Sequence, residues 1–379
     1  MSLYDKSSLL QVPSLYKDGT LVSTIPEDRS GDFTVSRGSN LAATRIGPDG
    51  YIKKGYENLL EQSNSFTTSP WQSLSSITDG QTGYDGSSDA WNFTSVSTNS
   101  PLIQNNSQGG VQTFSAYFKK NPNFGVQIFA FGSVNLRANF DLNAGNVVSS
   151  FSTIDAKIEP VGTDWFRCSI TFNQTNTSVR FYVTNNVSSY AVGTITIQDA
   201  QLNQGLVAYP YLETTTAPAQ GGLLENTPRL DWSNGVPAVQ LEEQRTNLIT
   251  QSEYFGDSSW FKGNLVVTPN SVVSPEGLQN GTEVNITSGG HFLFDYISVS
   301  PSTTYSFSWY AKRGTAASVS YSILDNTNIS NIISPTSYYN DISSTEWTRV
   351  SVEFTTPSNC SSVRTYTLRD GGQSGTIYL

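Results

Sequence analysis

The sequence is poor in the side chains that most often carry metal and redox chemistry. Its 379 residues include one histidine, His291, two cysteines, Cys168 and Cys360, and one methionine. A structural zinc centre takes four Cys or His ligands, so this supply excludes both a multi-histidine cage and a four-cysteine site. The cysteines lie 192 residues apart (360 − 168), in what we interpret as different domains. We therefore expect both to be small packing residues rather than a disulfide.

Charge is also scarce, and cations are scarcer than anions. Charged residues make up 14% of the chain, and 21 Lys and Arg against 31 Asp and Glu give a net charge of −10. Because this balance does not suit a phosphate backbone, nucleic acid is not an expected partner. No stretch approaches the roughly 20 apolar residues of a membrane span, and the first residues do not form a signal peptide, so we expect no membrane insertion or secretion signal.

What the chain does contain is uncharged polar and aromatic side chains. It has 7 Trp, 19 Tyr and 19 Phe, which supply ample apolar area for a core. Apolar and polar residues alternate with a period of two at 112–118, 305–311 and 347–354, as in half-buried strands. Turn-forming clusters at 87–89, 143–146 and 370–372 separate such runs. The pattern predicts an all-β fold.

Five ordered blocks recur within the chain and indicate a tandem duplication. The offset between matched blocks ranges from 182 (347 − 165) to 193 residues (307 − 114). In the clearest match, NLLEQSNSF is followed by Trp71, and NLITQSEYF is followed by Trp260. The matched pairs are 58–66 with 247–255, 114–119 with 307–312, 165–172 with 347–354, 178–180 with 362–364, and 193–197 with 375–379. A drifting offset is typical of insertions in loops, so the aligned tryptophans, including Trp165 and Trp347, are expected in both cores.

The repeat sets the predicted domain boundaries. We predict two tandem jelly-roll β-sandwiches at 57–213 and 247–379, preceded by a short irregular docking segment at 1–56 and joined by a connector at 214–246. The first copy continues through 198–202 beyond its last match, whereas the second does not. We therefore expect the second jelly roll to be truncated in its last strand and the chain to be the N-terminal part of a longer polypeptide.

These blocks carry a resemblance to a known group of proteins. The runs 247–260, 305–312 and 347–354 resemble the carbohydrate-binding-module-like jelly-roll repeats of bacteriophage tail and virion structural proteins. Segment 31–50 is similar to the N-terminal segment of those proteins, and 228–248 is similar to their interdomain connector. The resemblance implies a sugar site lined by aromatic residues, but it supplies no motif that fixes the site residue by residue.

Candidate ligand residues follow from comparing the two copies. Aromatic residues that occur in one copy only are better candidates than the recurrent ones, because a duplicated core must keep its packing. They are Tyr84 and Trp91 in the first copy, and Phe292, Tyr338 and Tyr339, together with His291, in the second. The adjacent pair Tyr338 and Tyr339 is the first choice, since neighbouring side chains of an extended strand point to opposite faces. The alternative is that these residues pack loops.

Asp79, Asp85 and Asp89 cluster in a Gly-rich stretch and form a candidate calcium site, because Ca²⁺ takes oxygen ligands. A solvated acidic loop is the alternative. His291 has no second histidine and is expected in a surface or loop role, and no other cofactor is expected.

The resemblance and the poverty of reactive groups together indicate a non-enzymatic virion protein. We expect a tail fibre or tail-associated appendage, assembled in the host cytoplasm, whose residues 1–56 dock onto other virion proteins and which forms a homo-oligomer such as a trimer. The alternatives are a capsid-decorating or head-fibre protein, a glycan-binding adhesin for a host surface and, less favoured, a polysaccharide depolymerase. Because the net charge is −10, neutral sugars are the expected ligands.

Overall fold

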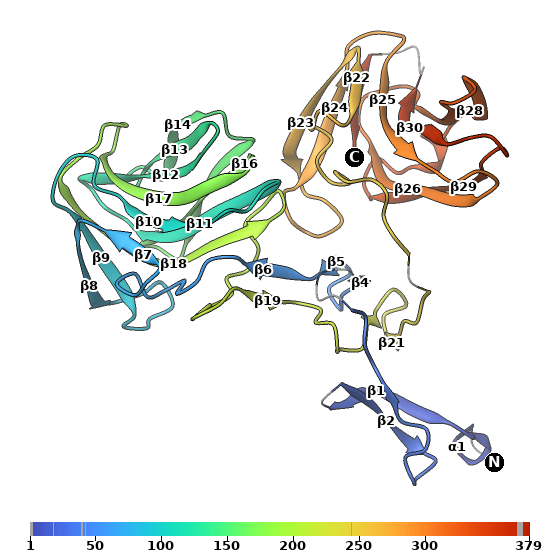
Figure 1. Ribbon diagram of the computed structural model, residues 1–379, viewed down its shortest axis with the longest axis horizontal. Coiled ribbons are helices and arrows are strands. Elements are labelled where there is room, and N and C mark those ends of the chain that lie inside the picture. Colours follow the sequence, from blue (N-terminus) through green and yellow to red (C-terminus); the bar gives the residue numbers. More distant parts are fainter. Residues whose placement is uncertain (1–2, 18, 39–40, 42, 244, 370–373) are drawn as a thin grey trace. The chain divides into compact units, whose positions relative to one another are not determined.

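The computed structural model describes residues 3–17, 19–38, 41, 43–243, 245–369 and 374–379. The turn predicted at 370–372 therefore lies outside the described residues. The chain divides into two compact units, Met1–Glu242 and Glu243–Leu379, and each contains one β-sandwich (Figure 1). No helix among the described residues is long and apolar enough to cross a membrane.

The first sandwich consists of two antiparallel six-stranded sheets. The front sheet has the order β14 (Asn146–Phe151), β13 (Asn135–Asp141), β12 (Phe124–Gly132), β17 (Asn176–Asn185), β10 (Leu102–Asn105) and β7 (Trp71–Ser73). The back sheet has the order β15 (Asp155–Val161), β16 (Trp165–Asn173), β11 (Val111–Lys119), β18 (Gly193–Gln204), β9 (Ala90–Ser95) and β8 (Ser76–Gln81). Non-consecutive strands are neighbours in both sheets, as the predicted jelly roll requires.

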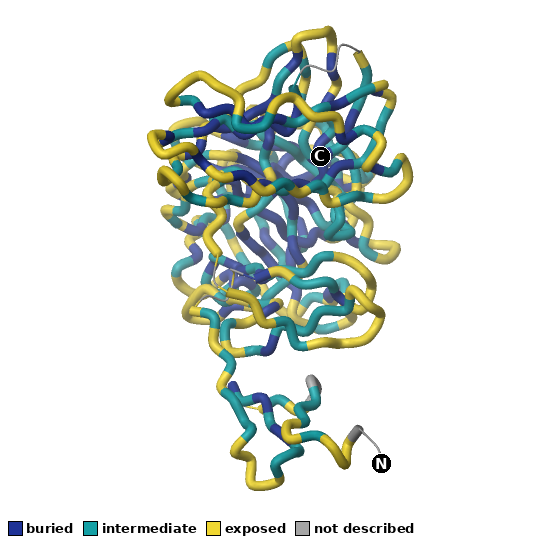
Figure 2. Tube along the Cα trace, turned by 90° about the vertical axis from the view of Figure 1, so that its right-hand side faces the viewer, coloured by how far each residue is buried: buried dark blue, intermediate teal, exposed yellow. Residues whose placement is uncertain are grey.

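Alternation along the strands builds the core between these sheets. On β12, Val126 and Ile128 point inward and are fully buried, whereas Phe131 lies on the other face and is exposed. In the core, the ring of Phe181 stacks on that of Phe114 and lies edge-on to that of Phe118. Figure 2 shows the buried residues following the sandwich strands. Because side chains alternate with a period of two, each inward-facing set leaves a second set available on the outer face of the sheet.

The second sandwich repeats this plan with five strands in each sheet. One sheet has the order β22 (Phe261–Gly263), β25 (Phe292–Ser298), β30 (Ser362–Arg369), β27 (Ser320–Asp325) and β28 (Ser330–Ser337). The other has the order β23 (Leu265–Val272), β24 (Gly281–Ile286), β31 (Gly375–Tyr378), β26 (Thr304–Arg313) and β29 (Thr348–Thr355). Strands β14 and β15 have no counterpart among its described residues. The repeat offset falls by 11 residues (193 − 182) at this point, which the two additional strands explain.

Strand register confirms the duplication. Phe114 pairs with Ile170 in the first sandwich, and the matched residues Phe307 and Val352 pair in the second. The indole of Trp71 donates to the carbonyl of Gln62 at 2.9 Å, and the indole of Trp260 donates to the carbonyl of Gln251, also at 2.9 Å. Both tryptophans are buried. The tandem all-β jelly-roll prediction is therefore confirmed.

One part of the duplication prediction is wrong. Trp165 is buried at the start of β16, but Trp347 precedes β29 and is only half-buried. Its indole donates to the carbonyl of Val273, and the ammonium of Lys312 lies 5.2 Å from its ring centre. In the first sandwich Val161 of β15 packs beside Trp165, whereas the second sandwich has no equivalent of β15 to cover Trp347.

The described residues of segment 1–56 and of the connector up to Glu242 form small sheets within the first unit. The first begins with α1 (Leu3–Lys6) and a sheet of β1 (Leu10–Lys17), β2 (Thr20–Ile25) and β3 (Phe33–Thr34), followed by the hairpin β4 (Thr44–Ile46) and β5 (Ile52–Lys54). The connector strand β19 (Ala219–Gly221) pairs with β6 (Tyr56–Asn58), and β20 (Leu230–Asp231) pairs with β21 (Ala238–Val239).

These two segments also contact each other directly. The Tyr16 hydroxyl donates to the carbonyl of Asn226 at 2.7 Å, and the amide of Ile46 donates to the Asp231 carboxylate at 3.0 Å. The segment predicted as irregular is therefore partly ordered against the connector.

Both cysteines are buried and free, which confirms their expected role as packing residues. Cys168 belongs to the first core and Cys360 to the second. Burial raises the pKa of the Cys168 thiol well above its ordinary value, so this side chain stays protonated at neutral pH.

Candidate functional site

Tyr338, the first-choice ligand residue, is a core residue of the second sandwich. It is 1% exposed, its hydroxyl donates to the carbonyl of Thr367 at 3.0 Å, and its ring lies edge-on to that of Trp309. Tyr339 begins the short helix η1 (Tyr339–Asp341) and is half-buried, with the Arg313 guanidinium 5.1 Å from its ring centre. The structure contradicts the prediction for Tyr338, because the pair lies at a strand-to-helix junction and not in an extended strand.

Tyr84 and Trp91 both pack against residues of the protein: Tyr84 against Tyr117 of the back sheet, and Trp91 of back-sheet strand β9 against the core. The ring of Tyr84 stacks on that of Tyr117 with a centre-to-centre distance of 4.1 Å, and its hydroxyl donates to Asp199 at 2.8 Å. Trp91 lies at the edge of the core, and its indole donates to the carbonyl of Asn64. These contacts support the alternative that the two residues pack loops.

The structure does not assemble the predicted calcium site. Within the described part of the chain, no group of three or more Asp, Glu, His or Cys side chains is arranged to hold a metal ion. Asp89 and Asp85 both accept from the amide of Gln198, at 2.7 Å and 3.4 Å, and the backbone N–H of Ser87 donates to Asp85. The carboxylates of Asp85 and Asp89 thus order their own loop, whereas Asp79 is exposed on β8.

His291 is also placed differently from the expected surface position. It lies in the loop before β25 and is almost completely buried, so of the expected surface or loop role the loop position is the one observed. Phe292 is half-buried beside Phe294 on the outer face of the second sandwich.

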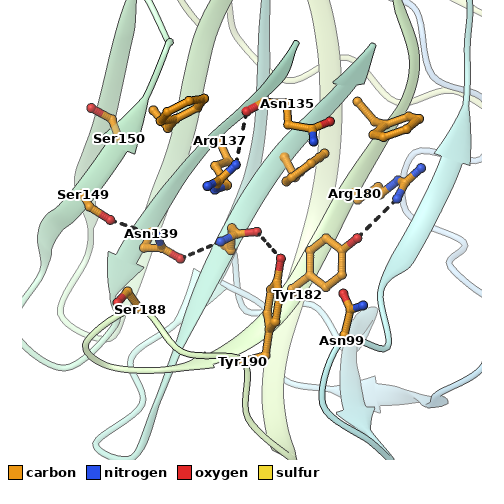
Figure 3. Close-up of a pocket in the computed structure, with 14 residues that line it drawn as sticks. Asn99, Asn135, Arg137, Asn139, Ser149, Ser150, Arg180, Tyr182, Ser188 and Tyr190 are labelled. Atoms are coloured by element: carbon orange, nitrogen blue, oxygen red, sulfur yellow. Dashed lines mark hydrogen bonds between the residues drawn. The ribbon is translucent and has the colours of Figure 1, made fainter. Parts of the chain in front are cut away.

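A pocket of about 720 Å³ lies on the outer face of the front sheet, and none of the predicted ligand residues lines it (Figure 3). Strands β12, β13, β14 and β17 supply most of its lining, the segment after β17 supplies Ser188 and Tyr190, and the loop before β10 supplies Asn99. The lining residues are Asn99, Gln127, Phe129, Phe131, Asn135, Arg137, Asn139, Ser149, Ser150, Phe151, Arg180, Tyr182, Ser188 and Tyr190.

Strand alternation explains why these side chains meet. Gln127, Phe129 and Phe131 are the residues of β12 that alternate with its core-facing positions, and Arg180 and Tyr182 do the same on β17. Strand β12 pairs with both β13 and β17, so the outward-facing residues of three strands lie in adjacent rows. The pocket is therefore lined by the face of the front sheet that points away from the core.

A chain of hydrogen bonds crosses the floor of the pocket. The Tyr190 hydroxyl lies 3.1 Å from the Gln127 side-chain oxygen, the Gln127 amide donates to Asn139 at 2.9 Å, and the Asn139 amide donates to the Ser149 hydroxyl at 2.9 Å (Figure 3). Gln127 and Asn139 are buried, so these bonds fix the orientation of both amides. The floor is a pre-formed row of polar groups.

Aromatic rings and guanidinium groups surround this floor. Phe151 is 50% exposed, Phe131 is 37% exposed, and Tyr190 is also exposed, whereas Phe129 and Tyr182 are buried beneath them. Burial and the neighbouring Tyr182 raise the pKa of the Tyr190 phenol, while Arg137 and Arg180 act in the opposite direction. The Tyr190 phenol is therefore neutral at physiological pH and can donate a hydrogen bond.

This arrangement suits a polar ligand with apolar faces. Amide and hydroxyl groups can pair with ligand hydroxyls, and exposed rings can cover C–H surfaces. Sequence reasoning missed the site because it chose aromatic residues by their absence from the other copy and not by the sheet face on which they lie. The available signal was the alternation of Gln127, Phe129 and Phe131 on the outer face of a strand whose inner face is wholly apolar.

The equivalent sheet of the second sandwich carries a related surface. Arg364, which matches Arg180 in the repeat, lies 5.1 Å from the ring centre of Tyr296 and 5.4 Å from that of Phe294. Phe261 stacks on Phe294 at 5.2 Å, and both Phe261 and Tyr296 are exposed. The exposed aromatic residues here belong to β22 and β25, whereas those of the first sandwich belong to β12, β14 and the segment after β17.

Comparison with known families identifies the type of domain. Residues 256–368 match the family described as carbohydrate binding domain, and this stretch lies within the second unit. The second sandwich is therefore similar to carbohydrate-binding domains, and the first sandwich repeats its strand plan. No curated protein sequence matches the chain.

Several solved structures are similar to parts of the chain at low sequence identity. A structure described as "CBM4 structure and function" is 18% identical with a TM-score of 0.23, over 26% of this chain and 66% of that one. The tandem CBM22-1–CBM22-2 domain of Paenibacillus barcinonensis Xyn10C is 11% identical with a TM-score of 0.27, over 89% of this chain and 97% of that one. The enzymatically active domain of bacteriophage CBA120 tailspike protein 4 is 14% identical with a TM-score of 0.24, over 38% of this chain and 21% of that one. At these values the likenesses assign no ligand and no activity to this chain.

Proposed function

We propose that the chain is a non-enzymatic glycan-binding protein whose first sandwich binds sugar in the pocket on its front sheet. The observation that carries the proposal is the combination, in one pocket, of a fixed polar floor with exposed phenylalanine and tyrosine rings. Sugars present hydroxyl groups at their edges and C–H groups on their faces, so this combination matches their chemistry. The carbohydrate binding domain match of residues 256–368 supports the same function for the tandem pair.

The wider role that we propose is structural, in a bacteriophage virion. The support is the resemblance of segments 31–50, 228–248 and the repeated blocks to tail and virion proteins. In this proposal a tail fibre or tail-associated appendage docks through residues 1–56 and presents its two sandwiches to host surface glycans. The oligomeric state is proposed to be trimeric, and a capsid-decorating or head-fibre position remains the alternative.

A glycan array probed with the full chain tests the binding function. We expect the double variant Phe131→Ala/Phe151→Ala to lose at least about tenfold in affinity, since each ring loses its stacking contact and both are exposed enough to be replaced without opening the core. Tyr51→Ala is the matched control, because Tyr51 is an exposed aromatic on the β4–β5 hairpin, away from the pocket. Unchanged binding by the double variant would refute the pocket as the site.

Deletion of residues 1–45 tests the virion role separately. In a phage that encodes this chain, the deletion is expected to abolish incorporation into particles while both sandwiches stay folded, because the sandwich cores contain none of these residues. Normal incorporation of the shortened chain would refute docking through this segment.

A further inference from the structure

The pocket differs in charge from the chain as a whole. Acidic residues outnumber basic ones by 31 to 21, yet the pocket lining contains two arginines, Arg137 and Arg180, and no Asp or Glu. Neither guanidinium forms a salt bridge with any residue in the described ranges. A half-buried cation without a counter-charge costs solvation energy, so the pocket is poised to gain from an anionic ligand.

Arg180 is held in place by its neighbours. Its guanidinium lies 4.3 Å from the ring centre of Phe131 and 5.8 Å from that of Phe129. Its Nε donates to the Ser178 hydroxyl at 2.9 Å and its Nη1 lies 3.3 Å from the Tyr182 hydroxyl, as Figure 3 shows for Tyr182. A guanidinium has five N–H donors, so these contacts orient the group and leave donors for a ligand.

Arg137 is arranged in a similar way on the neighbouring side. Its guanidinium lies 4.8 Å from the ring centre of Phe151, and its Nη1 donates to the carbonyl of Asn135 at 3.4 Å. Both arginines line the same pocket as Tyr190. Each exposed phenylalanine ring of the pocket is therefore paired with one guanidinium, Phe131 with Arg180 and Phe151 with Arg137.

We infer that the pocket selects glycans that carry carboxylate groups, such as uronic acid or sialic acid residues; this rests on the proposed glycan-binding function. The planar guanidinium edge can donate two parallel hydrogen bonds to one carboxylate, while the adjacent ring covers the sugar face. This inference replaces the expectation of neutral sugars, which considered only the net charge. At physiological ionic strength charges are screened over about 8 Å, so the local pair of arginines outweighs the distant acidic surface.

The test is a binding assay with matched glycans that differ in charge alone. Polygalacturonate, hyaluronan, alginate and polysialic acid are immobilised beside the carboxyl-reduced form of each, together with dextran and dextran sulfate. The full chain is expected to bind at least one carboxylated glycan and to lose at least tenfold in affinity for its reduced form. Binding should also weaken as salt increases from about 0.05 to 0.5 M.

Variants connect the result to the two arginines. Arg137→Gln and Arg180→Gln are each expected to weaken binding of the carboxylated glycan by about tenfold or more, and Arg180→Lys is expected to recover only part of the loss, because it keeps the charge but not the paired donors. Arg349→Gln is the matched control, because Arg349 is an exposed arginine on β29 of the second unit. Melting temperatures show whether each variant remains folded.

Each outcome decides between the two claims. Equal binding of the carboxylated and reduced forms would overturn the inference and leave the proposed glycan binding intact. Dextran sulfate bound as tightly as the carboxylated glycans would also overturn it, because the pocket would then respond to charge density alone. Failure to bind every glycan, both in the panel and on the wider array, would overturn the inference and the proposed function together.

Discussion

At the scale of single residues, the structure separates aromatics that look alike in the sequence. Tyr338 and Tyr190 both lie in Ser/Asn-rich stretches, but one is a core residue and the other borders the pocket. Sequence spacing could not distinguish them, because Tyr338 is buried by Trp309 and Thr367, which come from distant strands. The residue types were enough to predict that aromatic side chains supply the cores, but not which aromatic side chains line the pocket.

Replacing Tyr338 should therefore affect stability and not recognition. We expect Tyr338→Ala to lower the free energy of unfolding of the second sandwich by about 3 to 5 kcal/mol, through lost packing and an unsatisfied Thr367 carbonyl. Urea unfolding followed by hydrogen exchange of second-unit peptides measures this. A stable variant with reduced glycan binding would contradict the assignment of Tyr338 to the core.

Asp199 supplies a pH-dependent contribution to stability. This carboxylate is buried in the first sandwich, and burial raises its pKa from 3.8 to about 6, despite a hydrogen bond from Tyr84. Between these two values the folded state holds the proton more tightly than the unfolded state. The contribution of Asp199 to stability is therefore fully present below about pH 4 and is lost as the pH rises through about 6.

The variant Asp199→Asn should remove this dependence. Relative to the unmodified chain, we expect it to gain up to about 3 kcal/mol in unfolding free energy between pH 4 and pH 7, since about two units of pKa are involved. Asparagine also tolerates the positive φ of 54° at this position. Parallel urea titrations at the two pH values check the result, and a difference of the opposite sign would show that burial does not raise this pKa.

At the scale of elements, the function of a strand depends on which of its faces is considered. On β12 the inward residues were predictable as core from their period of two, but the outward residues form a site only because β13 and β17 lie on either side. Strand β17 follows β12 by more than 40 residues, and the sequence does not show that they pair. The presence of strands β14 and β15 in the first copy only is visible in the sequence as a fall in the repeat offset, but that fall does not show that the extra residues form strands.

Two substitutions on β12 separate these faces. Ile128→Ala, at a fully buried position, should cost about 2 to 5 kcal/mol of unfolding free energy, whereas Phe131→Ala, on the outer face, should cost less than about 1 kcal/mol. Chemical denaturation of the two variants measures the difference. Equal losses would mean that Phe131 contributes to the core and that the pocket is not an independent surface.

At the scale of the whole molecule, duplication explains both what is shared and what differs. The shared parts are the order of the matched strands and the burial of Trp71 and Trp260, which the matched blocks predicted, together with the indole hydrogen bond of each tryptophan. The outer faces have diverged, with the exposed aromatic residues on different strands of the equivalent sheets. Cores were predictable because packing restricts both copies alike, whereas the outer faces are free to change.

This divergence predicts independent ligand preferences. Phe261→Ala/Tyr296→Ala, on the exposed face of the second sandwich, should leave binding of carboxylated glycans by the front-sheet pocket within about twofold of the unmodified chain. Titration of the full-length variant with the glycan selected in the array checks this. A loss of about tenfold would indicate that both faces contact the same glycan chain.

The most direct test of glycan binding in the pocket is a crystal structure of the full chain with the tightest-binding oligosaccharide. The account predicts a sugar ring in contact, within about 4.5 Å, with Phe131 or Phe151, and hydroxyl groups hydrogen-bonded to the Gln127–Asn139 floor. A carboxylate of the ligand should lie against Arg137 or Arg180. An oligosaccharide bound on the back sheet, with the pocket empty, would contradict the account.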